Sequence, residues 1–294
     1  MTTKIIYHQV KPGIDCPDGI FSALIVRKVY PDAQLIGCVY QGELPEVKEG
    51  DRLIIVDFSL SAEVIASWTE RGVEVLCIDH HKTALESLTC FDVSHLSGRI
   101  EQEIGKFKFV FDVKECGATL TWKYFFPDEP MPPFLEYVRD RDLWDFLLPK
   151  SEEIHEAVAS MRRTHALFDM LSLMSREDLL KFIAPVGEKL LAPKREKIAA
   201  AASRYQWEDV AGYTVPVVRL NTDGSEDRLT SDICMKLYKE ITEAPFVACV
   251  TSDGTYSLRS DKHKADGGFD VSVVARAQGG GGHASAAGYK PIPK

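Results

Sequence analysis

Short apolar runs alternate with amphipathic stretches along the first half of the chain. The β-branched runs over 4–7, 52–56 and 73–78 predict buried strands. Helical patterns begin near Gly19 and after Ser61, whose hydroxyl suits an N-cap. Further strands are predicted over 33–40 and 107–112, and further helices from 81–83 onward and over 117–126 and 133–144. Because strands separated by helices form parallel sheets with right-handed crossovers, this half predicts an α/β domain.

The second half starts with a helical pattern and ends with shorter strands. Helical spacing runs from 151 to about 202, and Ser175 with Asp178 predicts a helix start. Beyond it, strands are predicted over 213–220, 248–252 and 255–259, with a helix over 231–242. We therefore expect a parallel-sheet domain over 1–190, a helical linker over 191–205 and a smaller mixed-sheet α/β domain over 206–294.

Composition and charge exclude several classes of protein. The 294 residues are 45% hydrophobic and 27% charged, which is typical of a globular protein with a full core. A formal net charge of -9 argues against binding of duplex nucleic acid through a broad electrostatic attraction to its phosphates. The seven cysteines are scattered without a CxxC pair, which favours a reduced, cytoplasmic protein. We expect no membrane segment and no signal peptide, because the first residues lead straight into a strand.

Metal-competent side chains follow the ends of three predicted strands. His8 and Asp57 end the first two runs, and Asp79-His80-His81 ends the third. Such groups are costly to bury without partners, so they should face something that binds them. The carboxyl ends of parallel strands meet at one edge of a sheet, where open α/β folds bind ligands. The pattern therefore predicts a metal cluster at this edge.

A hydrolytic two-metal site needs several carboxylates and imidazoles around two divalent ions, and one carboxylate often bridges the two ions. Mixed oxygen and imidazole ligands favour Mn²⁺, with Mg²⁺ or Co²⁺ as substitutes. The candidate ligands are His8, Asp15, Asp18, Asp57, His80 and Asp142.

Six short segments stand in a fixed order along the chain. Four of them carry acidic or histidine side chains, namely 16–19 (CPDG), 56–59 (VDFS), 79–81 (DHH) and 140–144 (DRDLW). The last two are 257–260 (SLRS) and the glycine-rich 279–288 (GGGGHASAAG). Together they resemble the motifs of the DHH phosphoesterase superfamily and its DHH-associated substrate-binding domain, in the branch of oligoribonucleases and single-strand exonucleases. The resemblance covers nearly the whole chain.

The resemblance implies a role for each matching residue. Asp57 would bridge two Mn²⁺ ions, and His81 would contact the substrate phosphate. Asp79 would orient the neighbouring histidines rather than bind metal. The other ligands it implies are Asp18, His80 and Asp142 for one ion, and His8 and Asp15 for the other.

The first motif departs from the family pattern, which has two aspartates one residue apart with a histidine shortly before them. Here Cys16 occupies the first aspartate position, while Asp15 is displaced by one residue and His8 lies farther upstream. Either Asp15 or Cys16 could supply the missing ligand, or this metal site could be weak. We favour Asp15, because an oxygen ligand suits Mn²⁺ better than a thiolate does.

The glycine-rich run predicts an anion-binding loop. Four successive glycines expose backbone N–H groups, and a helix predicted over 283–287 would add its N-terminal dipole. Arg259 can donate two hydrogen bonds to one phosphate. The predicted substrate-binding residues are Arg259, Gly280, Gly281, Gly282 and His283. The resemblance implies that this domain holds the end of the substrate.

These observations predict a metal-dependent phosphodiesterase for short single-stranded oligonucleotides or small nucleotides, with a hydroxide activated by two metal ions. Its predicted catalytic residues are Asp57, Asp79 and His81. One alternative is a phosphoanhydride hydrolase of the pyrophosphatase or exopolyphosphatase type. Another is a nucleotide-binding module with a degenerate metal site, which the Cys16 departure favours. Duplex nucleic acid and membranes are not expected partners, and a homodimer is an open alternative.

Overall fold

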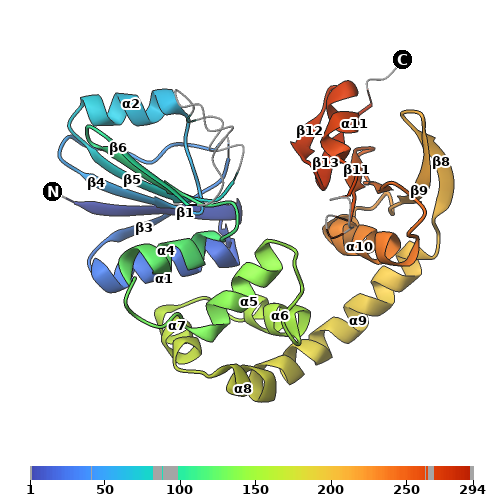
Figure 1. Cartoon of the computed structure of the whole chain (residues 1–294), viewed down its shortest axis with the longest axis horizontal. Helices are drawn as coiled ribbons and strands as arrows, with labels where there is room; N and C mark the ends of the chain where they lie inside the picture. The colour runs from blue at the N-terminus through green and yellow to red at the C-terminus, as the bar shows by residue number, and fades with distance from the viewer. Residues whose placement is uncertain are drawn as a thin grey trace. The chain divides into compact units, whose positions relative to one another are not determined.

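The chain divides into two compact units, Met1–Leu190 and Leu191–Lys294 (Figure 1). The computed structural model describes residues 2–40, 42–81, 88, 99–261, 263 and 268–291. Cys90 and the helix predicted from 81–83 onward fall outside these ranges. The roles predicted for the two domains, metal chemistry in 1–190 and substrate binding in 206–294, stay predictions.

The first unit is built on a mostly parallel sheet, as predicted. Five of its strands are parallel neighbours in the order β3, β1, β4, β5, β7. Two antiparallel strands were not predicted: β6 pairs with β7 at one edge, and the short β2 folds back on β1. The strands are β1 (Thr3–Lys11), β2 (Ile14–Asp15), β3 (Gln34–Cys38), β4 (Arg52–Val56), β5 (Glu74–Asp79), β6 (Ile100–Ile104) and β7 (Phe107–Phe111).

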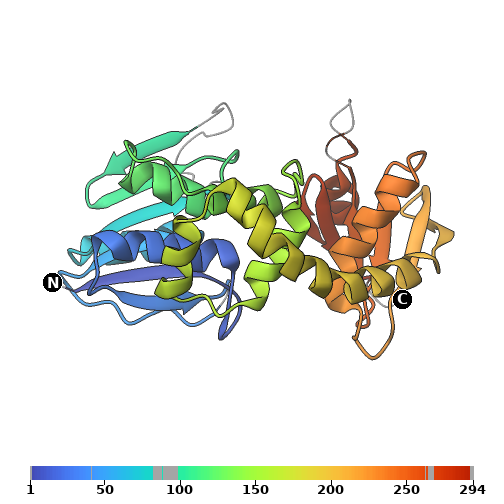
Figure 2. The ribbon, with the colours of Figure 1, turned by 90° about the horizontal axis from the view of Figure 1, so that it is seen from below.

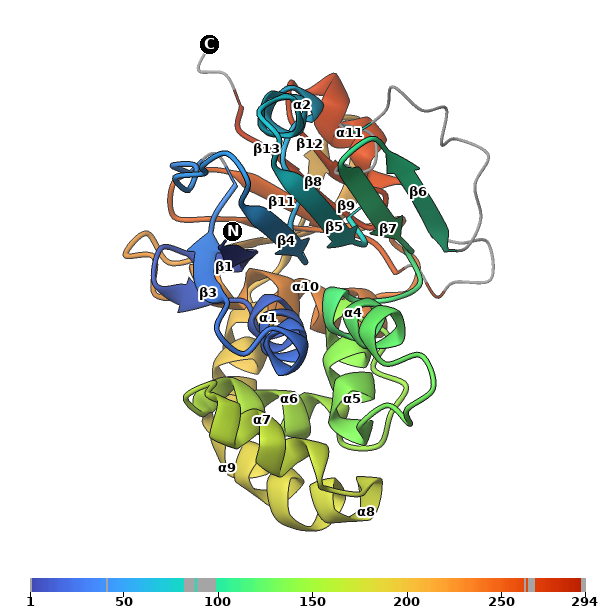
Figure 3. The ribbon, with the colours of Figure 1, turned by 90° about the vertical axis from the view of Figure 1, so that its left-hand side faces the viewer.

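Helices cover both faces of this sheet (Figure 3). On one face lie α1 (Pro17–Val29) and α4 (Gly117–Phe125), side by side in Figure 2, and α2 (Ala62–Glu70) lies on the other. Alternate residues of β4 serve the two layers: Ile54 packs in the core with α1, whereas Ile55 packs with Trp68 of α2. A sheet that is apolar on both faces is what parallel strands require. Ser61 caps α2 as predicted, accepting a bond from the amide of Val64.

A helical segment completes the first unit and runs into the second. A helix starts at Ser175 as predicted, and Ser175 and Asp178 cap each other reciprocally, with backbone N to side-chain oxygen distances of 3.0 and 3.1 Å. The helices are α5 (Pro133–Asp142), α6 (Ser151–Ser160), α7 (His165–Ser172), α8 (Arg176–Asp178), the π-helical turn Leu179–Ile183 and α9 (Ala184–Ala202). No helix among the described residues is long and apolar enough to cross a membrane.

The second unit contains the predicted mixed sheet, in the order β12, β13, β11, β10, β9, β8. Only β9 and β10 are parallel, joined through α10 (Thr230–Glu240), and the other neighbours are antiparallel. One face packs on α11 (Val271–Ala277), and the other packs on α10 and the end of α9. The strands are β8 (Gln206–Val210), β9 (Tyr213–Arg219), β10 (Val247–Val250), β11 (Tyr256–Arg259), β12 (Gly281–His283) and β13 (Ala286–Tyr289).

The helix predicted over 283–287 is wrong, because this segment forms a hairpin of β12 and β13. β13 pairs with β11 along its whole length and buries Ala287 and Tyr289 on one face. That long-range ladder overrides the weak helical preference of a few small residues. Gly282 crosses β13 closely with φ +138°, where a Cβ would lie 2.6 Å from the Ala286 carbonyl oxygen. The glycine run is therefore not followed by a helix dipole.

The six described cysteines, at positions 16, 38, 77, 116, 234 and 249, all carry free thiols. Five of them are buried. They act as small apolar core residues, which is how unpaired cysteines commonly pack.

Candidate metal centre

The predicted ligands of the first unit meet where the strand order reverses. From β1 the chain crosses to β3 on one side and later returns to β4 on the other side. The carboxyl ends of strands at such a switch point are the usual ligand site of open α/β sheets. His8 lies at this end of β1, level with Cys38 of β3, and Asp57 follows directly on β4. The topology thus brings both residues to one place.

Asp57 occupies the centre of the cluster in an unusual conformation. It is 1% exposed and has φ 52°, a left-handed value that is uncommon outside glycine. Gly117 and Gly19 make room for it. A Cβ on Gly117 would lie 2.6 Å from the Asp57 Cβ, and one on Gly19 would lie 3.1 Å from its Oδ2. Backbone strain of this kind concentrates at functional sites, where the surrounding structure enforces it.

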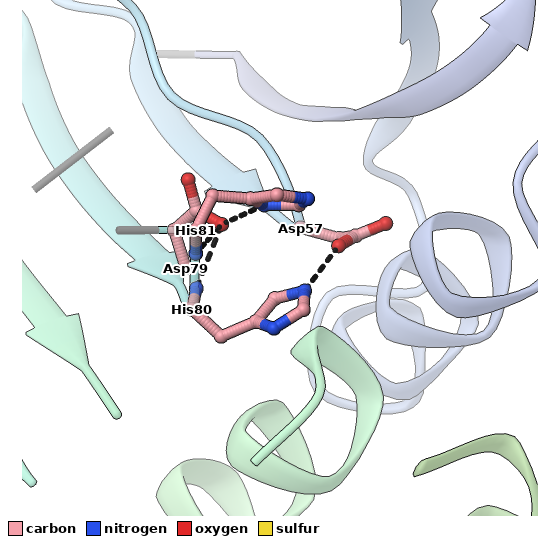
Figure 4. A group of neighbouring side chains, drawn as sticks. All are labelled: Asp57, Asp79, His80 and His81. Carbon is pink, nitrogen blue, oxygen red and sulfur yellow. Dashed lines mark hydrogen bonds and ion pairs between the residues drawn. The ribbon is translucent and has the colours of Figure 1, made fainter. Parts of the chain in front are cut away.

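The two oxygens of Asp57 face two different groups of side chains. Oδ1 lies 3.2 Å from Nε2 of His80 (Figure 4), and Oδ2 lies 3.5 Å from Nδ1 of His8. On the first side, His80 Nε2 is also 3.7 Å from Asp18 and 3.5 Å from Asp142. On the second side, Cys16 joins His8 and Asp57, with one ligand atom of each within 4.8 Å of the others. Asp57 therefore connects two candidate ion sites.

The donors at this place fit divalent cations. Asp57 Oδ2 is buried and has no hydrogen-bond partner among the described residues. An unpaired buried carboxylate oxygen is costly, and a cation would satisfy it. Carboxylate oxygens combined with imidazole nitrogens suit Mn²⁺, while a thiol on one side adds a softer donor.

Mutual repulsion of the carboxylates shapes the protonation of the cluster. Burial, and then the charges of Asp57 and Asp142, raise the pKa of Asp18 well above its usual range. Burial would lower the pKa of His80, but the hydrogen bond to Asp57 and the charges of Asp142, Asp57 and Asp18 raise it to about 10. A protonated His80 thus offsets part of the negative charge when no metal is bound. A divalent ion would supply that charge instead and displace protons.

Asp79 holds the two histidines in place (Figure 4), and one of its oxygens also lies within 4.8 Å of ligand atoms of Asp57, His80 and His81. Its Oδ1 accepts from the amide of His80 at 2.7 Å, and from the amide and Nδ1 of His81 at 3.2 and 2.7 Å. Its Oδ2 accepts from the hydroxyl of Ser59 at 2.6 Å. Sequence reasoning missed Ser59, although its position two residues after Asp57 was visible.

Asp18 is held by the start of a distant helix. The amides of Gly117 and Ala118, at the N-terminus of α4, donate to its two oxygens at 2.6 and 2.7 Å. The positive end of a helix stabilises a carboxylate in this position. From its sequence, this segment is predicted to be a tight helix start that packs behind the site, without a catalytic role. The only signal was Gly117 at a helix start.

Replacing Gly117 with alanine should weaken metal binding. The new Cβ would meet Asp57 and lie 3.0 Å from Asp18 Oδ2, so α4 must move and loosen its two bonds to Asp18. Loss of such an outer partner typically lowers metal affinity about 10- to 100-fold. Titration of Mn²⁺ by calorimetry measures the effect. Gly37→Ala is the matched control, because the three atoms nearest its Cβ would all belong to the flexible side chain of Gln9. Unchanged affinity in Gly117→Ala would contradict this role.

The structure does not bring Asp15 into the cluster, and this corrects the preference for it over Cys16. Asp15 stands opposite Gln9 in the β1–β2 ladder and accepts bonds from Gln9 Nε2 at 2.8 Å and from the Tyr7 hydroxyl at 2.9 Å. Because side chains alternate along a strand, Asp15 shares the face of Tyr7 and Gln9, opposite to that of His8. The amide of Cys16 instead bonds to the carbonyl of His8 at 3.3 Å.

The predicted substrate residues of the second unit lie on β11 and β12, which flank β13, except for Gly280, which directly precedes β12. Arg259 of β11 is level with Ala286 of β13, which is level with His283 of β12. The guanidinium donates to the hydroxyls of Ser257 and Ser231 at 3.0 and 3.1 Å, which fixes its direction. The side chain of His283 is outside the described part of the structure.

The glycine run passes close to the neighbouring strand. A Cβ on Gly280 would lie 2.1 Å from the carbonyl oxygen of Gly288, whereas one on Gly281 would meet nothing within 4 Å. Gly280 therefore serves close packing of the backbone, and Gly281 lies open.

Comparison with known proteins gives distant relatives over nearly the whole chain. No family model matches it. The chain is 25% identical to an uncharacterised protein of Acanthamoeba polyphaga mimivirus, over 97% of this chain and 66% of that protein. It is 26% identical to the oligoribonuclease NrnB of Bacillus subtilis (strain 168), over 96% of this chain and 71% of that protein. The chain thus spans about two thirds of the length of these relatives.

Two solved structures share the fold. The pGpG-specific phosphodiesterase PggH of Vibrio cholerae matches with a TM-score of 0.53 at 12% identity, covering 99% of this chain and 94% of that one. The DHH domain of a member of a family of ribosomal proteins matches with a TM-score of 0.58 at 13% identity, covering 98% of this chain and 82% of that one. At these identities the likeness concerns the fold alone. Together with the oligoribonuclease relative, it supports the resemblance to the DHH phosphoesterase superfamily that the ordered motifs carry.

Proposed function

We propose that the chain is a divalent-metal-dependent phosphodiesterase that hydrolyses short oligonucleotides or small nucleotides. The observation that carries the proposal is the Asp57 carboxylate, whose two oxygens face two separate groups of metal-competent side chains. A shared carboxylate between two ion sites is the arrangement that two-metal phosphoryl chemistry uses.

In this proposal Asp57 would help to hold two ions, one on each side of its carboxylate. Its partners are Asp18, His80 and Asp142 on one side and His8 and Cys16 on the other. When bound, the two ions would lower the pKa of a water molecule and neutralise phosphate oxygens. A sulfur donor on the second side disfavours Mg²⁺ relative to Mn²⁺ or Co²⁺ there.

His81 is the proposed contact for the substrate phosphate. Its side chain is 25% exposed and its Nδ1 is engaged by Asp79, so Nε2 is left to donate to a phosphate oxygen. Burial would lower the pKa of His81, but the hydrogen bond and charge of Asp79 raise it above its usual value. Asp79 is therefore the residue proposed to hold His81 in its cationic, donating form.

Short substrates are favoured by both the relatives and the charge of the chain. NrnB is named an oligoribonuclease, and PggH is named a pGpG-specific phosphodiesterase. A net charge of -9 gives no general attraction for long nucleic acid. We assign the first unit to the chemistry, and Arg259 with the open backbone at Gly281 and with His283 to the anionic end of the substrate.

The test is an assay with Mn²⁺ and 5′-labelled di- to decanucleotides, with pyrophosphate and short polyphosphate alongside. We expect mononucleotides to appear only with Mn²⁺. The activity of His80→Ala should fall by more than the roughly 10- to 100-fold that follows loss of a residue that only supports a metal ligand, because His80 is itself a proposed ligand. His165→Ala is the control, since this exposed histidine lies outside the cluster.

The other outcomes have separate meanings. Phosphate release from anhydrides alone would replace the proposal with a phosphoanhydride hydrolase. No turnover of any substrate, together with fewer than two bound metal ions, would replace it with a nucleotide-binding module. In that case, comparison of oligonucleotides of different length would give no information about the substrate.

A further inference from the structure

An aromatic side chain without an assigned role lies beside the metal centre. Tyr40 follows β3 at the start of the connection 39–51, at the same sheet edge as the cluster, because Cys38 is level with His8. Its ring centroid is 5.4 Å from the ring of His8 and 6.2 Å from that of His81. The ring therefore borders both histidines, which come from two different strands.

The ring of Tyr40 is supported from the protein side and open on the solvent side. Phe58, which is 2% exposed, packs against it with a centroid distance of 4.7 Å. Tyr40 itself is 47% exposed, and no described residue hydrogen-bonds to its hydroxyl. Core packing alone does not explain a large half-exposed ring fixed at the rim of an ionic cluster. A rigid ring has little conformational entropy to lose when a ligand covers it.

We propose that Tyr40 is a stacking surface for the base of the nucleotide whose phosphate contacts His81. This inference rests on the proposed function for the class of ligand. One nucleotide can place its phosphate at His81 and its base on the neighbouring ring. Bases stack on aromatic side chains with little sequence preference, because every base has a π-face. The surface therefore selects nucleotides over inorganic phosphate, and purines over pyrimidines by their larger stacking area.

The alternative is that Tyr40 only supports His8 and His81 by packing. The two roles separate when a ligand with a base is compared with one that has none. Loss of stacking would weaken binding of only the ligand that has a base. Loss of support for the histidines would weaken binding of both ligands.

The test measures binding of a nucleoside 5′-monophosphate and of inorganic phosphate to the Mn²⁺-loaded protein by calorimetry. Tyr40→Ala should weaken binding of the nucleotide about tenfold and leave phosphate unchanged. Tyr40→Phe, which keeps the ring, should bind as the parent does. Tyr40→Leu keeps an apolar cover over Phe58 and should repeat the result of Tyr40→Ala. Phe182→Ala is the matched control, a ring 55% exposed in the segment Leu179–Ile183.

Equal weakening of nucleotide and phosphate, or no weakening of either, would overturn the inference. Absence of nucleotide binding in the parent protein would do so too. The readout is binding rather than turnover. A parent protein that binds nucleotides through Tyr40 but cleaves no oligonucleotide would therefore refute the proposed function and leave this inference standing.

Discussion

Replacing Asp57 with asparagine should abolish most of the activity while leaving the fold intact. Asparagine has the same shape and tolerates the left-handed backbone that Asp57 adopts at φ 52°. The change removes a negative charge, and it leaves a single acceptor oxygen where two are needed. Because the oxygens face His80 on one side and His8 on the other, both candidate ion sites are affected at once. A loss of several kcal/mol of transition-state stabilisation corresponds to a fall in kcat/KM of roughly a thousandfold or more.

The measurement is kcat/KM on a dinucleotide at saturating Mn²⁺, with the metal content of the purified protein determined in parallel. Asp15→Asn provides the same chemical change at a carboxylate outside the cluster, where the amide oxygen can still accept the bonds from Tyr7 and Gln9. We expect this control to keep two bound ions and most of its activity. If Asp15→Asn costs as much as Asp57→Asn, the assignment of Cys16 to the second ion site is wrong.

The parallel sheet and the location of the cluster could be predicted because they depend on local patterns. Each apolar run ends in a polar residue, and parallel strands bring their carboxyl ends to one edge. That reasoning needs no knowledge of distant contacts. It correctly indicates that His8, Asp57 and His80 lie close together.

Features that depend on pairing between distant segments could not be predicted in this way. The amides that hold Asp18 come from a helix start about one hundred residues later in the chain. The exclusion of Asp15 follows from the register of a two-residue strand, which fixes the face it shares with Gln9. The hairpin at the end of the chain owes its strand conformation to β11, whereas its sequence alone is compatible with a helix.

Binding of Mn²⁺ should stabilise the first unit strongly, even without substrate. In the metal-free protein the carboxylates of Asp18, Asp57 and Asp142 share one protonated imidazole, and Asp57 Oδ2 lacks a hydrogen-bond partner among the described residues. An ion that binds only the folded state at a hundred times its dissociation constant adds about 2.7 kcal/mol. For a unit of this size that corresponds to a rise in Tm of roughly 5–10 °C.

The stabilisation should grow as the pH rises from about 6 to about 8, because the bound ion displaces protons from the cluster. Protons in the cluster oppose metal binding, because the pKa of His80 is raised to about 10, and burial with the neighbouring charges raises the pKa of Asp18 above its usual range. Raising the pH lowers the cost of removing them and hence strengthens metal binding. Thermal unfolding with Mn²⁺ and with a chelator, at several pH values, measures the effect. Asp57→Asn should show little of the shift, because both ion sites depend on that carboxylate. A shift of the same size in Asp57→Asn would mean that the stabilising ion binds elsewhere and that the cluster is not the metal centre.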